Sequence, residues 1–371
     1  MVIAKHAVLT FLAVYSVLAE PVLGQIPQGY FTDVRNVSPN TGVASFDFAA
    51  FASADGLTLY FSDTRNNGLT PIPGNLGDED MWMATRSSVD EVFSNLVNLG
   101  PGVNGPNADD VGSISSDGLT LYFGSNRSGN WDLYQATRSS TSEPFGNPET
   151  LGPGVNTVAV ENVPRVSPDG LTMVYHVGLE GRADRDIWMA SRSSPSEPFG
   201  NARSLDMNSD VEDWWPTISS DGLALITSDS YFRPLRPGGE GGLDIWVWTR
   251  NGPDEAFTQA MNPDVLWPGS ELNSSRDAGY VYLSPDWPAI GSKIYFTGEV
   301  SAARGYGDVF QATWVPEPTT SGITFAIILL LTGCKRRRLP SSLELDFPNR
   351  WDGIRDHRFA QCCQSMLSND N

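Results

Sequence analysis

Acidic side chains recur along this chain at a fixed distance from a repeated serine. Asp47, Asp109, Glu161 and Asp213 each lie six residues before the serine of a Ser-x-Asp-Gly sequence or a close variant of it. Carboxylate oxygens are the ligands that Ca²⁺ prefers, and this ion takes six to eight of them. The spacing therefore predicts a carboxylate ring that binds a hard cation. The alternative is that each carboxylate accepts hydrogen bonds from the backbone or an arginine of the neighbouring repeat.

A second group of candidate residues lies on segments that differ from one repeat to the next. Loops on a rigid scaffold commonly carry recognition, and aromatic rings beside acids can stack on sugar rings. We therefore predict a ligand-binding face that consists of Trp214, Trp215, Tyr231, Arg233, Arg236 and Trp267. The alternative for Trp214 and Trp215 is packing between repeats.

Sequence signatures of enzymes are largely missing. His176 is the single histidine between residues 25 and 314, and no Gly-x-Ser-x-Gly elbow accompanies it. We predict no catalytic residues and no cofactor other than a calcium ion. A carbohydrate-active enzyme of the glycosidase or lyase kind stays open as the alternative, because acids such as Glu180, Asp184, Glu212 and Asp229 could form a carboxylate pair.

A repeat of about 52 residues must position these side chains. The phrase Ser-x-Asp-Gly-Leu-x-Leu-Tyr-Phe, followed by Asp-Ile-Trp-x-Ala-Thr-Arg-Ser-Ser, begins with more or less variation at five serines: Ser53, Ser115, Ser167, Ser219 and Ser284. Asp-Gly is a turn signal and the flanking runs suit strands, so each unit holds four short antiparallel strands. A period of this size is typical of propellers and solenoids. We predict an all-β fold, a β-propeller of five blades, with six blades as the alternative.

Closure of such a ring needs a partner for its last open edge. The final repeat ends at Trp314 without a fourth strand, and residues 30–37 precede the first repeat. We predict that this N-terminal strand completes the fifth blade. A sixth blade drawn from residues 264–284 is the alternative. The repeat arginines Arg86, Arg138, Arg192 and Arg250 are expected to pair with repeat aspartates and to join neighbouring blades.

The repeat resembles the WD40-like (PD40) repeat of TolB-type β-propellers over residues 30–314. The resemblance implies the fold and a binding or scaffolding role, since this family mostly binds partners.

Both ends of the chain predict export. Residues 1–24 fit a signal peptide, which leaves residues 25–314 as the propeller. Residues 315–338 contain Pro316, Glu317 and Pro318, then an apolar run and a basic cluster, and resemble the PEP-CTERM sorting signal of Gram-negative bacteria. This resemblance implies an exosortase-type processing enzyme as partner, a membrane segment, and a location at the cell surface or outside the cell after processing. The status of the tail, residues 339–371, stays open.

The charge of the chain excludes one class of partner. The formal net charge is −20, because the chain has 24 Lys and Arg but 44 Asp and Glu. No basic patch is present to neutralise phosphates, so we expect no nucleic acid partner. The sequence thus predicts an exported, surface-anchored propeller that binds a polysaccharide or an envelope protein. The alternatives are the carbohydrate-active enzyme and a purely structural envelope protein.

Overall fold

The structure is a computed structural model of the chain. It describes residues 27–39, 47–64, 72–178, 185–208, 213–229, 236–239, 243–258, 260–270, 272–273, 278–298 and 307–317. For residues 47–49 and 64 it describes the backbone only. The chain divides into two compact units, Met1–Glu317 and Pro318–Asn371. All described residues belong to the first unit, so the account below concerns that unit alone.

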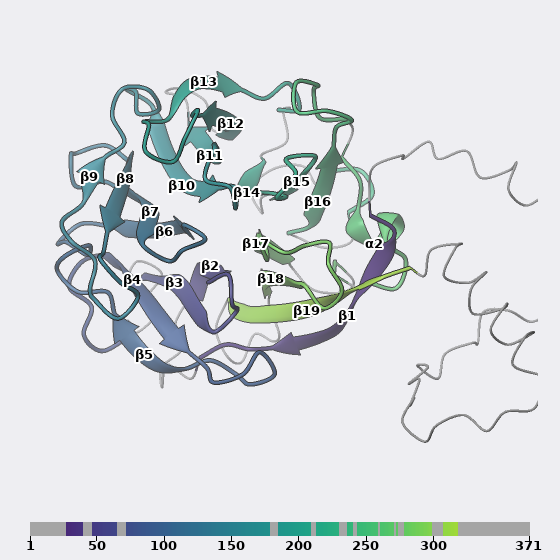
Figure 1. Cartoon of the computed structure of the whole chain (residues 1–371), viewed down its shortest axis with the longest axis horizontal. Helices are drawn as coiled ribbons and strands as arrows, with labels where there is room; N and C mark the ends of the chain where they lie inside the picture. Colours follow the sequence, from purple (N-terminus) through teal and green to yellow (C-terminus); the bar gives the residue numbers. More distant parts are fainter. Residues whose placement is uncertain are drawn as a thin grey trace, which may run out of the picture. The chain divides into compact units, whose positions relative to one another are not determined.

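The first unit is a five-bladed β-propeller, as the sequence predicted (Figure 1). Blade 1 consists of β2 (Asp47–Ala52), β3 (Thr58–Thr64), β4 (Glu79–Thr85) and β5 (Ser94–Asn98). Blade 2 consists of β6 (Asp109–Ile114), β7 (Thr120–Ser125), β8 (Asp132–Thr137) and β9 (Glu149–Thr150). Blade 3 consists of β10 (Val160–Val166), β11 (Thr172–Gly178), β12 (Arg185–Ser191) and β13 (Gly200–Ser204).

The last two blades depart from this regular form. Blade 4 has β14 (Trp214–Ile218), β15 (Ala224–Ser228) and β16 (Ile245–Thr249), and its outer edge is reduced to a bridge between Val247 and Met261. Blade 5 has β17 (Ala278–Leu283), β18 (Lys293–Gly298), β19 (Asp308–Pro316) and β1 (Gly29–Asn36). A single short helix, α2 (Pro263–Leu266), follows blade 4 in the described part of the chain.

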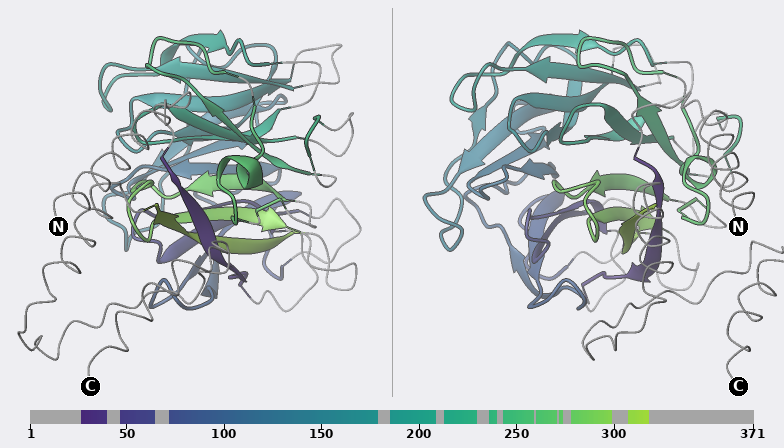
Figure 2. Two further views of the ribbon diagram at one scale, coloured as in Figure 1. Left: turned by 90° about the vertical axis from the view of Figure 1, so that its right-hand side faces the viewer. Right: turned by 45° about the vertical axis from the view of Figure 1, so that its right-hand side comes forward.

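The N-terminal strand closes the ring, which confirms the predicted closure. β1 pairs antiparallel with β19, and the sheet order is β1-β19-β18-β17. Both views of Figure 2 show β1 beside β19. Phe31 of β1 is fully buried against Trp267 and Trp314, with ring centroids 5.5 and 4.9 Å apart. The alternative sixth blade is wrong, because the segment proposed for it holds α2 and then β17, the innermost strand of blade 5.

The Ser-x-Asp-Gly sequences make the turns between the first and second strand of each blade. In blade 2 the hydroxyl of Ser115 and the amide of Leu119 both donate to Oδ1 of Asp117, at 2.5 and 3.0 Å. Gly118 has a φ of 73°, a region that glycine adopts without steric cost. The hydrogen bonds hold the pKa of Asp117 below its ordinary value. We call the face with these turns the turn face, and the opposite face the loop face.

Three of the four repeat arginines join neighbouring blades, but through tyrosine rather than aspartate, whereas Arg250 donates to the carbonyls of Gly222 and Pro253 of its own blade. Arg192 of blade 3 donates to the hydroxyl of Tyr122 in blade 2 (3.0 Å) and to the carbonyl of Gly170 in its own turn (2.6 Å). Arg138 donates to Tyr60 in the same way, and Arg86 to Tyr295. The predicted aspartate partners were wrong because Ser hydroxyls and backbone amides already occupy those carboxylates.

A repeated asparagine fixes the third strand of four blades, which the sequence analysis did not predict. Asn104 accepts from the amide of Met81 and donates to its carbonyl, both at 2.9 Å. Three further asparagines make the same pair of bonds, namely Asn156, Asn208 and Asn273. In blade 5 the hydroxyl of Ser38 takes this place and accepts from the amide of Val309.

Candidate functional site

Five innermost strands surround the propeller axis, and each carries a β-bulge near its middle. These strands are β2, β6, β10, β14 and β17, and each contacts its neighbours around the ring. The pairing register of each with its second strand shifts at this point, for example between Asn162 and Arg165. A bulge re-aims side chains locally. Residues at and beside these bulges form a series that runs from blade 1 to blade 5, which we call the axial belt: Ser62, Asp110, Asn162, His176, Trp214, Trp215 and Tyr280.

The first half of the axial belt is polar and crosses three blades. Asp110 of blade 2 accepts from the hydroxyl of Ser62 in blade 1 (3.1 Å) and from the amide of Asn162 in blade 3 (3.0 Å). Asp110 and Asn162 are buried, at 5% and 8% exposure. Burial raises the pKa of Asp110 to about 6, although Ser62, Arg165 and Asn162 lower it. This carboxylate therefore titrates near neutral pH.

The second half of the axial belt is aromatic. Trp214 contacts the ring of His176 (5.5 Å between centroids) and that of Trp215 (4.8 Å), and Trp215 lies 3.6 Å from Tyr280 of blade 5. The guanidinium of Arg185 covers Trp214, 4.5 Å from the ring centroid. Trp214 and Tyr280 are half-buried, whereas Trp215 is buried. The two halves meet where Asn162 pairs with His176 across β10 and β11.

His176 is neutral in this setting. It is 1% exposed, and burial together with Arg185 holds its pKa well below the ordinary value. A guanidinium nitrogen of Arg185 lies 3.1 Å from Nε2, so this nitrogen accepts the hydrogen bond. The neutral ring thus orients Arg185 over Trp214.

The backbone at the axial belt is held in an unusual conformation. Val163, Trp215 and Tyr280 occupy equivalent bulge positions and have φ angles of 52°, 48° and 52°. Bulky and β-branched residues rarely adopt this left-handed region, and such residues cluster at functional sites. The bulges therefore fix side chains near the axis in place, at a cost in backbone conformational energy.

The acids of the predicted carboxylate ring stand at the starts of the innermost strands, and the three whose side chains are described each have partners of their own. Asp109 bonds to Arg127 (2.5 Å) and to the amide of Gly105 (2.7 Å). Glu161 accepts from the hydroxyl of Thr157 (2.5 Å), and Asp213 pairs with Arg236 (2.7 Å). These partners come from the carboxylate's own blade or the segment just before it. Of Asp47 only the backbone is described.

No described group of three or more His, Cys, Asp or Glu side chains has an arrangement that would hold a metal ion. Burial nevertheless perturbs several of these acids. It raises the pKa of Asp213 to about 7 against the opposing effect of Arg236. It also raises the pKa of Glu79 well above the ordinary value, and Asp110 and Asp109 add to this effect. Burial thus disfavours the charged forms of Asp213 and Glu79.

Of the six residues predicted to bind a ligand, the four that the structure describes lie in different surroundings. Trp214 and Trp215 lie in the axial belt. They also pack between blades, which is the alternative role that the sequence analysis gave for them. Arg236 is engaged with Asp213 and lies over the rings of Trp246 and Trp248. Trp267 is fully buried, and its Nε1 donates to the carbonyl of Pro27 (3.0 Å). Tyr231 and Arg233 lie outside the described residues.

Of the four acids named for the alternative enzyme, only Asp229 is described. It accepts from the indole of Trp246 and from the amide of Asp244, at 3.0 and 2.7 Å. Both of its oxygens are thus used within blade 4.

The predicted sorting motif begins inside the propeller. Pro316 is the last residue of β19 and pairs with Gly29, and the amide of Glu317 donates to the carbonyl of Gln28 (2.9 Å). Pro318, the apolar run and the basic cluster lie outside the described residues, as do residues 1–24, which were predicted to be a signal peptide. Among the residues that are described, no helix has the length and apolar character to cross a membrane.

Sequence reasoning missed the polar half of the axial belt. Asp110 and Asn162 occupy the same repeat position, one residue after the periodic acid and five residues before the repeat serine. The other repeats carry different residue types at this position. A search for repeat positions that change chemistry from unit to unit would have found them, together with Trp214.

Comparisons with known proteins found distant similarity among solved structures alone. No protein-family model and no curated protein matches the chain. Solved structures similar to it include TolB from Acinetobacter baumannii, 13% identical, with 74% of this chain and 67% of that chain covered and a TM-score of 0.32.

Two carbohydrate-active enzymes are also among the similar structures. The catalytic domain of a GH62 α-L-arabinofuranosidase from Coprinopsis cinerea is 9% identical, with 78% and 98% covered and a TM-score of 0.49. A β-1,2-mannobiose phosphorylase from Listeria innocua is 11% identical, with 80% and 100% covered and a TM-score of 0.45. Likenesses of this strength concern the fold and carry no argument about function.

Proposed function

We propose that this propeller is an exported, surface-anchored binding module whose axial belt takes up a saccharide of the cell envelope. The observation that carries the proposal is the composition of the belt. It places a hydrogen-bonded carboxylate and amide, Asp110 and Asn162, in the same belt as the half-buried aromatic residues Trp214 and Tyr280. Saccharides offer hydroxyl groups for such polar groups and C–H faces for such rings.

The belt is also rigid, which favours binding. It is held by bulged strands from five blades, and its members are joined by hydrogen bonds and ring contacts. A site that is ordered before it binds loses less conformational entropy when the ligand arrives. Export and anchoring rest on the sequence of the chain ends, namely the signal peptide, the PEP-CTERM-like segment and the basic cluster.

A glycan array of bacterial surface saccharides, probed with the purified full chain, tests the proposal, and calorimetry then measures the affinity for any hit. We expect micromolar binding that weakens at least about tenfold in Trp214→Ala, which corresponds to about 1.4 kcal/mol of lost stacking and contact. Trp188→Ala is the matched control, because Trp188 is another partly buried tryptophan but lies on β12, the third strand of blade 3. No hit on the array, or equal weakening by both variants, would contradict the proposal.

Export is tested separately. An epitope tag placed after Asn371 should be lost from the surface-exposed protein if residues beyond the sorting motif are removed. Retention of the tag and of residues 1–24 in the mature protein would contradict the proposed processing.

A partner protein of the envelope, rather than a saccharide, would appear as binding to envelope extracts that glycosidase treatment does not abolish.

A hydrolytic enzyme is the second candidate, and the raised pKa values of Glu79 and Asp110 favour it. A carboxyl group that stays protonated near neutral pH can serve as a general acid. If the array hit is cleaved on prolonged incubation, and Glu79→Gln and Asp110→Asn abolish cleavage but retain binding, this second function replaces the first. Recovery of intact saccharide would instead support the binding module.

A further inference from the structure

We propose that Asn251 and Gly252 form a site of spontaneous deamidation, at which the side chain of Asn251 is converted to aspartate and isoaspartate in the folded protein. The reactant is water, and the product carries an additional negative charge. The site lies on the turn face, directly after β16 of blade 4. It is separate from the axial belt, and the proposal does not depend on saccharide binding.

The reaction needs only these two residues and water. The backbone nitrogen of Gly252 attacks Cγ of Asn251 and forms a new C–N bond, while the bond from Cγ to Nδ2 breaks. The amide proton of Gly252 leaves with Nδ2 as ammonia. Water then opens the resulting succinimide ring at either carbonyl, which gives aspartate or isoaspartate. Glycine favours the attack, because it has no Cβ to hinder the approach of its nitrogen.

The turn after β16 departs from the equivalent turns of the first three blades. Those blades have Ser-Ser after the repeat arginine, whereas blade 4 has Asn251 and Gly252. Asn251 is exposed, and its side chain makes no hydrogen bond with any described residue. The amide of Gly252 likewise donates to no described acceptor. Neither reacting group is therefore held by another bond within the part of the chain that the structure describes.

A second Asn-Gly sequence, Asn104 and Gly105, is locked by the fold. Asn104 is 3% exposed and bonds to the amide and the carbonyl of Met81, both at 2.9 Å. The amide of Gly105 donates to Oδ2 of Asp109 at 2.7 Å. Attack at Asn104 would require all of these bonds to open. The third Asn-Gly sequence, residues 67–68, lies outside the described residues.

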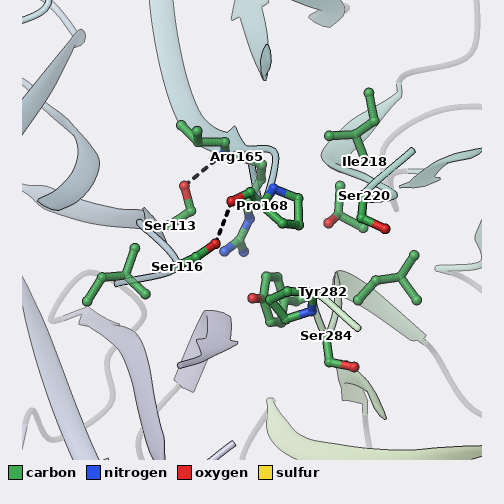
Figure 3. Close-up of a pocket in the computed structure, with 13 residues that line it drawn as sticks. Ser113, Ser116, Arg165, Pro168, Ile218, Ser220, Tyr282 and Ser284 are labelled. Atoms are coloured by element: carbon green, nitrogen blue, oxygen red, sulfur yellow. Dashed lines mark hydrogen bonds between the residues drawn. The ribbon is translucent and has the colours of Figure 1, made fainter. Parts of the chain in front are cut away.

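The four Asp-Gly turns of the propeller, which could form the same succinimide, are protected as well. In each turn the glycine amide donates to the carbonyl of the serine that begins the turn, at 2.8 or 2.9 Å: Gly56, Gly118, Gly170 and Gly222. Where these turns meet around the axis, the hydroxyl of Ser116 also donates to the carbonyl of Pro168 in the next blade (Figure 3). Among the described Asn-Gly and Asp-Gly sequences, the fold thus leaves Asn251 and Gly252 as the reactive pair.

Deamidation changes a turn that the repeat arginine of blade 4 holds. Nη1 of Arg250 donates to the carbonyl of Pro253 (2.6 Å), and the amide of Glu255 donates to the carbonyl of Gly252 (3.1 Å). Isoaspartate inserts an additional backbone carbon into this turn. In either product a new carboxylate joins the exposed acids Asp254 and Glu255.

Peptide mass spectrometry of the purified full chain, incubated at mildly alkaline pH in isotopically labelled water, tests the proposal. We expect the peptide with Asn251 to take up labelled oxygen at least about a hundredfold faster than the peptide with Asn104, whose hydrogen bonds must open first. In the chain unfolded by urea the two rates should be similar, because the fold supplies the protection of Asn104.

Gly252→Ala is the matched variant. A Cβ at this position would lie 3.9 Å from Glu255, an ordinary contact, and Gly252 does not have a positive φ, so the variant should keep the fold. It should slow the conversion of Asn251 and leave that of Asn104 unchanged. Equal rates at the two asparagines in the folded chain, or an intact Asn251 under conditions that convert it in the unfolded chain, would overturn the proposal.

Discussion

The contact between Tyr122 and Arg192 gives a sharp test of how the blades are held together. Tyr122 is 3% exposed, and its hydroxyl accepts from Arg192 at 3.0 Å across the interface of blades 2 and 3. In Tyr122→Phe the guanidinium keeps its bond to Gly170 and its place over the ring of Phe199, 4.1 Å from the centroid. Only the bond between the blades is removed.

The magnitude follows from the chemistry of that bond. A hydrogen bond to a charged group contributes about 1.5–3 kcal/mol. Arg192 is partly exposed, and water replaces some of the lost interaction, so we expect a loss of about 1–2 kcal/mol in the free energy of unfolding. For a domain of this size the Tm then falls by about 2–4 °C.

The neighbouring blade supplies a matched control. Tyr175 is fully buried, and its hydroxyl has no hydrogen-bond partner among the described residues. Tyr175→Phe removes the same atom without breaking a bond, so its stability should be unchanged or slightly higher. Urea unfolding followed by circular dichroism measures both variants. Equal losses of stability in the two would refute the assignment of Arg192 and Tyr122 as a pair that joins blades.

Four further outcomes follow from the structure. Phe31→Ala should cost about 3–5 kcal/mol in chemical denaturation, because it empties the space beside Trp267 and Trp314 in the closing strand, whereas the exposed neighbour Thr32→Ala should cost little. Asn104→Ala should cost about 2–4 kcal/mol in the same assay, since it leaves the amide and carbonyl of Met81 without a partner. Burial raises the pKa of Asp213 to about 7 in the folded chain, so the stabilising contribution of its neutral form is complete below about pH 4 and is lost as the pH rises to 7. Urea unfolding of Asp213→Asn at several pH values should therefore show a flatter dependence of stability on pH over this window. An unchanged slope would count against a raised pKa. Calcium and EDTA should each leave the Tm within about 1 °C of its value in buffer, because the acids at the strand starts are engaged separately, and a larger calcium-dependent rise would restore the predicted ring as a metal site.

The repeat made the fold predictable. The Ser-x-Asp-Gly turns recur with their hydrogen bonds, and the sequence placed the strands on either side of them correctly. The closing strand was predictable for a physical reason, since the last repeat lacks a fourth strand and an open edge must be paired. Blade 4 deviates where its repeat does, and its outer edge shrinks to the bridge at Met261.

The candidate site was only partly predictable, because side-chain direction at a bulge does not follow from alternation along a strand. Asp109 and Asp110 are adjacent and both acidic. The first bonds within its own blade, and the second bonds to Ser62 and Asn162 in the two neighbouring blades. Trp267 shows the opposite case. It was predicted to bind a ligand because it is a tryptophan on a variable segment, but the closing strand covers it in the structure.

Hydrogen exchange measured by mass spectrometry, with and without the best saccharide from the array, tests the central claim most directly. The account predicts slower exchange in peptides that contain β10 and β14, which carry Asn162 and Trp214, and no change in the turns at Ser53 and Ser115. Protection confined to the turn face or to the outer strands β5, β9 and β13 would contradict a binding site at the axial belt.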